Sequence, residues 1–172
     1  MGKLFLMMRS STVHGKSTWV KRQLKEGDAY ISRDEIRYQL LNEDDDYFSH
    51  ETEVFTIFIK KINEALLKYK RVFADATHLN QSSRAKVINR LEIKPDSINV
   101  IWLKTPLMEI YRRNDLRKGR ARVPKSSIKS MYDSIQEPMA KEGINKVYIV
   151  DSISHELKVL SLGNKNKENF IY

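Results

Sequence analysis

The sequence predicts an α/β domain in which five parallel strands form one sheet that helices cover on both faces. Apolar runs of strand length alternate along the 172 residues with segments of helical periodicity. Each strand candidate is continuously apolar, which is typical of strands whose two faces are both buried. We expect residues 1–160 to form one domain, and residues 161–172, which are polar and rich in lysine and asparagine, to form a tail.

Turn-forming and polar residues separate the first two strands and helices. Residues 4–8 form an apolar strand. After a polar stretch, a helix covers residues 19–24 and stops at Gly27, because glycine accepts the left-handed backbone common at helix ends. Residues 28–31 form the second strand, and a second helix opens over residues 32–37.

A long amphipathic helix dominates the middle of the chain. It covers residues 51–69, after the acidic loop 42–46, and its apolar residues recur at helical spacing, so we assign that stripe to the core. Residues 72–75 form the third strand. A helix over residues 80–91 ends ahead of Pro95, which breaks the chain.

The last third of the predicted domain contains a strand, two helices and the final strand. Residues 98–103 form the fourth strand, and residues 107–116 form the helix that follows it. The segment 117–123 is rich in arginine and has no apolar periodicity, so we expect a mobile lid. The helix over residues 124–136 starts with proline, which suits a first helical position, and residues 146–150 form the fifth strand.

Composition excludes several classes of protein. The chain has no cysteine, which rules out disulfides, thiolate metal sites and thiol catalysis. No apolar run reaches the length of a membrane-spanning helix, and the start of the chain lacks a signal-peptide cleavage pattern, so we expect a cytoplasmic protein without a membrane partner. The formal net charge of +9 favours polyanionic partners, although it also suits a well-solvated surface.

A phosphate-binding loop is predicted between the first strand and the first helix. The order of strand, tight loop, Gly15-Lys16-Ser17 and helix is the context of a P-loop. In such a loop, backbone N–H groups and the helix N-terminus bind phosphates, the lysine reaches the outer phosphates and the serine hydroxyl ligates Mg²⁺. The expected nucleotide-binding residues here are Ser11, Thr12, Val13, His14, Gly15, Lys16, Ser17 and Thr18.

This loop departs from the G-x-x-x-x-G-K-[ST] pattern. Ser10 takes the place of the first glycine, and Val13 is β-branched and does not readily adopt a positive φ. His14 could donate to a phosphate or simply be a surface imidazole. The alternative for the whole stretch is an ordinary loop followed by a helix cap.

Polar residues follow three of the predicted strands and should meet at one rim, because ligands of open α/β sheets bind beyond the carboxyl ends of the strands. Asp34 is our candidate general base for transfer of a phosphoryl group to a hydroxyl, although it could instead cap its helix, and Glu35 is the neighbouring alternative. Arg37 shares a helix face with Asp34 and could grip an acceptor phosphate with both arms of its guanidinium, or form a surface ion pair.

A metal ligand is expected at the end of the third strand. Asp75 follows the apolar run there and resembles the carboxylate that holds Mg²⁺ in nucleotide-binding folds. Together with Ser17 it forms our candidate metal site. The alternative role of Asp75 is to stabilise the turn at Thr77.

Basic residues concentrate between residues 104 and 129. Nine lysines and arginines stand there against two acidic residues, which are Glu109 and Asp115. We expect Arg113 and Arg117, spaced i, i+4 on one helix towards the lid, to neutralise charge on a transferred phosphoryl group. A solvated basic face would explain some of these charges but not their clustering.

These motifs, in this order, resemble those of the 5′-OH polynucleotide kinase family, the P-loop kinase domains of phage and bacterial enzymes that repair nucleic-acid ends. The resemblance covers roughly residues 3–150. The segments that carry it are Gly15–Trp19, Ser32–Arg37, Asp75–Asn80, Arg112–Arg117 and Val123-Pro124 with the helix through Tyr132.

The resemblance implies an ATP-dependent kinase that acts on 5′-OH ends of DNA or RNA. It implies that Lys16 and Ser17 contact the ATP phosphates and Mg²⁺, that Asp34 activates the 5′-hydroxyl, and that Arg37 holds the 3′-phosphate of the acceptor. The two lid arginines would then clamp the donor phosphates. Phosphatase or ligase modules accompany such kinases, so this chain would be either a kinase alone or one subunit of a repair set with separate phosphatase or ligase partners. The oligomeric state is left open.

Two other functions remain open at this point. A kinase of small molecules, such as nucleosides, nucleotides or sugars, would use the same rim chemistry. A non-catalytic module that binds nucleotide or nucleic acid would need the loop but no general base, so the pairing of Lys16 with Asp34 favours an enzyme.

Overall fold

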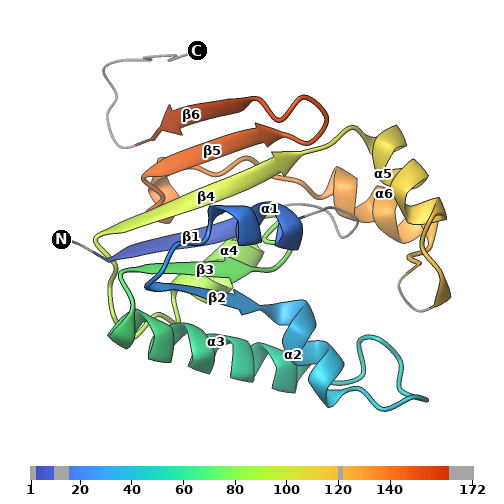
Figure 1. The fold of residues 1–172 in the computed structure, drawn as a ribbon, viewed down its shortest axis with the longest axis horizontal. Coiled ribbons are helices and arrows are strands. Elements are labelled where there is room, and N and C mark those ends of the chain that lie inside the picture. The colour runs from blue at the N-terminus through green and yellow to red at the C-terminus, as the bar shows by residue number, and fades with distance from the viewer. Residues whose placement is uncertain (1–2, 10–15, 120–121, 163–172) are drawn as a thin grey trace.

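The computed structural model describes residues 3–9, 16–119 and 122–162, and its centre is a six-stranded sheet of order β2-β3-β1-β4-β5-β6 (Figure 1). The first five strands run parallel, and β6 pairs antiparallel with β5. The strands are β1 (Leu4–Arg9), β2 (Asp28–Ser32), β3 (Arg71–Asp75), β4 (Ser97–Lys104), β5 (Lys146–Asp151) and β6 (Leu157–Ser161).

All five predicted parallel strands are present, but the prediction missed a sixth strand, β6, whose antiparallel pairing makes the sheet mixed. This strand lies at the sheet edge, and its polar residues Lys158 and Ser161 leave no continuous apolar run of strand length to reveal it. A tight turn over residues 152–156 joins it to β5 and imposes the antiparallel direction. Ser161, which we expected to begin the tail, is part of β6, and residues 163–172 of that tail lie outside the described residues.

Helices appear in all the segments where the sequence predicts them. The segment predicted as a helix over residues 124–136 ends early, since α6 stops at Asp133 and Ser134 caps it. The helices are α1 (Lys16–Gln23), α2 (Arg33–Leu40), α3 (Glu51–Lys68), α4 (Gln81–Ile88), α5 (Leu107–Asp115) and α6 (Lys125–Asp133), with a short 3₁₀ helix at Ala140–Glu142.

The core lies on both faces of the sheet, as predicted. On one face Phe5 of β1 belongs to the same buried cluster as Phe58 and Leu66 of α3. On the other face Val20 of α1 belongs to a buried cluster with Phe73 of β3. Each of these fully buried side chains contributes about 1.5–3 kcal/mol to folding relative to an exposed one. Figure 1 shows α1 in front of the sheet and α4 behind it.

The parallel register aligns the carboxyl ends of the central strands. Ser32 of β2 pairs with Asp75 of β3, which pairs with Met8 of β1, and Met8 pairs with Ile101 of β4. The residues that follow these strands therefore start at one rim. In Figure 1 this rim is on the right, where α2, α5 and α6 also lie.

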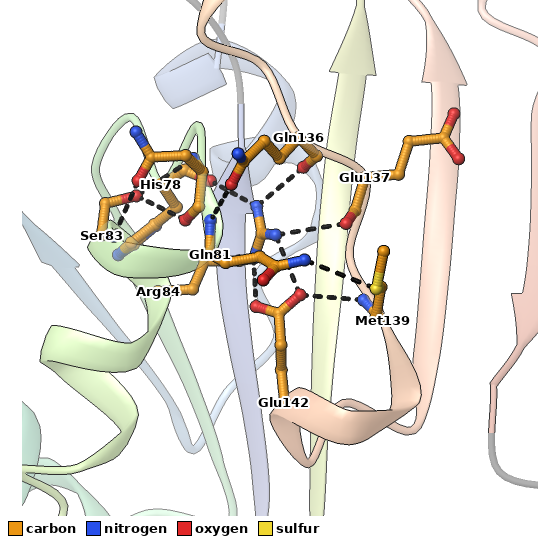
Figure 2. A network of polar contacts seen from close by, with 9 residues as sticks. His78, Gln81, Ser83, Arg84, Gln136, Glu137, Met139 and Glu142 are labelled. Carbon is orange, nitrogen blue, oxygen red and sulfur yellow. Dashed lines mark hydrogen bonds and ion pairs between the residues drawn. The ribbon is translucent and has the colours of Figure 1, made fainter.

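A buried arginine fixes the connection between α6 and β5 (Figure 2). Arg84 of α4 has no exposed surface and pairs with Glu142 through Nε at 2.7 Å and Nη2 at 3.0 Å. Its Nη1 donates to the carbonyls of His78 and Gln136, and Nη2 donates to that of Glu137. The network joins the segment after β3 to the segment after α6, and it pairs the charge that burial would otherwise make costly.

Candidate active site

The predicted phosphate loop lies between two described elements. β1 ends at Arg9 and α1 begins at Lys16, so the strand–loop–helix order is present. The predicted loop contacts of Ser11, Thr12, Val13, His14 and Gly15 lie outside the described residues, as do the side chains of Lys16 and Ser17. What the structure adds is the position of the helix N-terminus, which faces the rim where anions bind most favourably.

Asp34 stands in the first turn of α2 with its side chain 54% exposed. The helix cap is Ser32, whose Oγ accepts the N–H of Glu35 at 3.2 Å, so Asp34 is not needed for capping. Instead, Oδ1 of Asp34 accepts the hydroxyl of Tyr47 at 2.9 Å and pairs with Nη1 of Arg37. The carboxylate of Asp34 is thus accessible to solvent at the rim, while Tyr47 and Arg37 bind one of its oxygens.

Arg37 is buried, and its guanidinium binds protein side chains. It is only 5% exposed, and its Nε and Nη2 reach Oε1 of Glu51 at 2.7 and 2.5 Å. Its Nη1 donates to the hydroxyl of Tyr47 at 2.8 Å as well as to Asp34. The prediction that Arg37 presents an open fork to an acceptor phosphate is therefore not met in this arrangement, where the fork binds Glu51 and supports Asp34.

The surroundings of Arg37 and Tyr47 keep each of these two side chains in one protonation state. Burial alone would lower the pKa of Arg37, but its contacts with Tyr47, Glu51 and Asp34 outweigh burial and raise the pKa above its ordinary value. Burial, reinforced by the charge of Asp34, raises the pKa of Tyr47 well above its usual range. Tyr47 therefore remains a hydroxyl donor to Asp34 and Arg37 remains a cation at neutral pH.

Asp75 ends β3 as a buried carboxylate, 4% exposed, and its Oδ2 accepts the hydroxyl of Tyr30 at 2.6 Å. The strand register places it beside the end of β1, from which the chain runs to α1. Carboxylate oxygens are ligands that Mg²⁺ prefers. Within the described part of the chain, no three histidine or acidic residues gather into a group that could hold a metal.

The basic region on α5 is tied to acidic and carbonyl partners. Arg113 donates from Nε to Glu109 at 2.6 Å and from Nη2 to the carbonyl of Ser152 at 3.2 Å. Hydrogen bonds from Arg112 and then Arg113 lower the pKa of Glu109 to about 2. Because α5 ends at Asp115, Arg117 lies past the helix, and the expected i, i+4 pairing on one helix face does not hold.

Both ends of the predicted lid are bound by one buried asparagine, whose role the sequence did not reveal. Asn114 is 1% exposed; its side chain accepts the N–H of Val123 at 2.9 Å and donates to the carbonyl of the same residue at 2.8 Å. The carbonyl of Asn114 accepts the N–H of Arg117 at 3.0 Å. The described ends of segment 117–123 are thus fixed, while Arg120 and Ala121 lie outside the described residues.

A cavity of about 590 Å³ opens between α1, α5 and the ends of β4 and β5. This volume falls within the range of small-ligand pockets. It lies beside the first turns of α1, and its lining combines an aromatic side chain with cationic and hydroxyl groups. The lining includes Thr18, Trp19, Arg22, Arg113, Ser152 and His155.

The fold and this rim together define an α/β domain of the P-loop kinase type. A family model described as an AAA domain matches residues 12–138, and the chain belongs to that family.

Solved structures with the same fold include a chain of the Pnkp1/Rnl/Hen1 RNA repair complex, with a TM-score of 0.65 and 15% identity over 97% of this chain. The present chain spans 50% of the length of that chain. A gluconokinase from Sinorhizobium meliloti 1021 matches with a TM-score of 0.54 and 17% identity, over 88% of this chain and 83% of the gluconokinase. A sugar kinase from Janibacter sp. HTCC2649 matches with a TM-score of 0.54 and 16% identity, over 87% of this chain and 84% of the kinase.

Proposed function

We propose that this protein is an ATP-dependent kinase that transfers the γ-phosphate of ATP to the 5′-hydroxyl end of DNA or RNA. The observation that carries the proposal is Asp34, an exposed carboxylate that Tyr47 and Arg37 hold at the rim where α1 begins. Such a kinase would act in the cytoplasm during end repair, alongside phosphatase and ligase activities.

In this proposal the proton of the 5′-hydroxyl passes to Asp34 as the oxygen bonds to the γ-phosphorus. The bond from that phosphorus to its bridging oxygen breaks, and ADP leaves. Asp34 is suited to the task because it is solvent-accessible, while Tyr47 and Arg37 restrict its orientation. Lys16, with Arg113 and Arg117, would balance charge on the phosphates.

Mg²⁺ fits the residues at the end of β3. Asp75 offers a buried carboxylate, and Ser17 stands at the start of α1, so these two residues would hold the ion beside the nucleotide phosphates. When bound, the ion would supply positive charge to the phosphate oxygens. The adjacent cavity would take the nucleoside part of ATP, since it borders the first turns of α1.

A kinase of small molecules is the second candidate. One local observation favours it: the connection from α2 to α3 on the acceptor side carries four consecutive acidic residues, which would repel a long polyanion lying across it. The gluconokinase and the sugar kinase also share the fold over most of their own lengths. A non-catalytic binding module explains less, because binding alone does not require the contacts that orient Asp34.

The test is phosphoryl transfer from γ-labelled ATP to a 5′-OH oligonucleotide and, in parallel, to nucleosides and gluconate. The proposal expects the oligonucleotide to be the best acceptor. Asp34→Asn should lower kcat by at least ~10²-fold because a positioned base is lost, whereas Glu35→Gln, its matched neighbour, should have a mild effect. A sugar as the best acceptor would establish the second candidate, and equal effects of the two substitutions would remove Asp34 from its role.

A further inference from the structure

Three aromatic rings cluster directly beyond Asp34. The ring of Tyr47 contacts that of Phe48 edge to face, at 4.7 Å between centroids, and that of Tyr38 at 6.1 Å. The guanidinium of Arg37 lies over the Tyr47 ring at 4.5 Å and over the Phe48 ring at 5.6 Å. This aromatic cluster of Tyr38, Tyr47 and Phe48 is thus held by the same arginine that supports the candidate base.

The cluster is open to solvent although its rings are large and apolar. Tyr38 is 55% exposed and Phe48 is 59% exposed. Burying such rings is favourable, so an exposed pair beside a functional carboxylate suggests a binding surface. Tyr38 comes four residues after Asp34 on α2 and therefore shares its helix face, while Tyr47 joins the cluster to Asp34 through its hydroxyl.

The chemistry of the proposed acceptor fits this placement. In a 5′-terminal nucleotide the attacked hydroxyl and the base are attached to one sugar, so the base must lie within one sugar of Asp34. Nucleobases stack on aromatic side chains with little dependence on sequence, because every base has a π-face. We therefore propose that Tyr38 and Phe48, oriented by Tyr47, bind the terminal base of the acceptor strand; this inference rests on the proposed function.

Charge favours a base over a phosphate as the occupant. The loop that leads to the aromatic cluster contains Glu43, Asp44, Asp45 and Asp46. These carboxylates repel phosphates but leave an uncharged ring unaffected. The loop would therefore admit the terminal base and direct the rest of the strand away from α3.

The experiment compares two acceptors that differ only in the terminal base. One is a 5′-OH oligonucleotide, and the other is the same strand with an abasic 5′-terminal nucleotide. Stacking of one base should give the intact strand a kcat/KM about 5- to 150-fold higher with the wild-type protein. In Tyr38→Leu and Phe48→Leu this ratio should fall, and in the double variant it should approach one.

Controls separate stacking from a structural role. Tyr38→Phe keeps the ring and should keep the ratio. Tyr69→Leu changes a ring that is 39% exposed at the far end of α3, and it too should keep the ratio. Thermal unfolding of each variant verifies folding.

The outcomes separate the inference from the proposed function. If the wild type phosphorylates both strands equally well, or if the leucine variants lower kcat/KM equally for both, the inference is overturned while the polynucleotide kinase stands. If the wild type phosphorylates neither strand, the proposed function fails, and the inference fails with it.

Discussion

At the scale of single residues, the structure changes the role of Arg37 more than that of Asp34. The sequence placed both on one face of a helix, which the structure confirms through their ion pair. It could not show that Glu51, fourteen residues after Arg37, folds back and takes the guanidinium. Arg37 therefore acts first on Asp34, and any contact with an acceptor phosphate would need Nη2 to leave Glu51.

Replacing Glu51 tests this arrangement. Glu51→Gln should lower the free energy of unfolding by about 1–2 kcal/mol, because a buried guanidinium loses a charged partner that is itself partly exposed. It should also lower kcat roughly tenfold, since small displacements of a catalytic group are costly. The measurements are urea unfolding and steady-state kinetics on one 5′-OH oligonucleotide.

Glu53→Gln is the matched control, two residues along α3 with a side chain that is 59% exposed, and it should be nearly silent. If Glu51→Gln left both stability and kcat unchanged, Arg37 would not depend on Glu51. Its predicted role as a phosphate clamp would then regain support.

At the scale of elements, apolar patterning predicted the five parallel strands and the helices because each buries a continuous stripe. The same reasoning missed β6, an edge strand whose apolar residues are interrupted by Lys158 and Ser161. It also missed the anchors that fix loops. Asn114 and Arg84 are buried polar residues, and no local pattern distinguishes them from surface residues. Asn114 binds Val123, nine residues later and across the lid, whereas Arg84 binds Glu142, fifty-eight residues later.

An ion pair between β2 and β3 gives the sheet a defined dependence on pH. Asp28 accepts from Nε of Arg71 at 2.8 Å and from the N–H of Lys25 at 2.7 Å, and its side chain is 6% exposed. Its hydrogen bond to Arg71 lowers the pKa of Asp28 below the ordinary value of 3.8. Because the folded pKa is the lower one, the pair stabilises the fold fully above the unfolded pKa.

Asp28→Asn should therefore destabilise the protein at neutral pH by about 1–2 kcal/mol, a value reduced by the partial exposure of Arg71. The difference from the wild type should shrink as pH falls below 3.8 and through the lowered folded pKa of Asp28. Urea unfolding at a series of pH values measures it. A difference that stayed constant across that range would show that the ion pair contributes no pH dependence.

At the scale of the whole molecule, charge is unevenly distributed along the rim. The α2–α3 connection is acidic, whereas the region from α5 to α6 carries most of the excess behind the net charge of +9. Part of this basic charge is paired, since Asp115 lies 3.1 Å from both Arg122 and Lys125. A nucleic-acid strand whose terminal base lies at α2 would be repelled by the α2–α3 connection and attracted towards α5 and α6.

The salt dependence of oligonucleotide binding tests whether the strand runs along α5 and α6. For single strands, the logarithm of the binding constant falls with the logarithm of salt concentration by about 0.7 for each phosphate neutralised. Lys118→Gln combined with Lys125→Gln should therefore make the slope shallower by about 1.4 if both lysines contact phosphates. Fluorescence anisotropy of a labelled 5′-OH oligonucleotide over a series of salt concentrations gives the slope. The control, Lys68→Gln with Lys94→Gln, removes the same charge beside the amino ends of β3 and β4 and should leave the slope unchanged. Equal changes in both double variants would mean that net charge alone attracts the strand, and α5 and α6 would lose their role as its path.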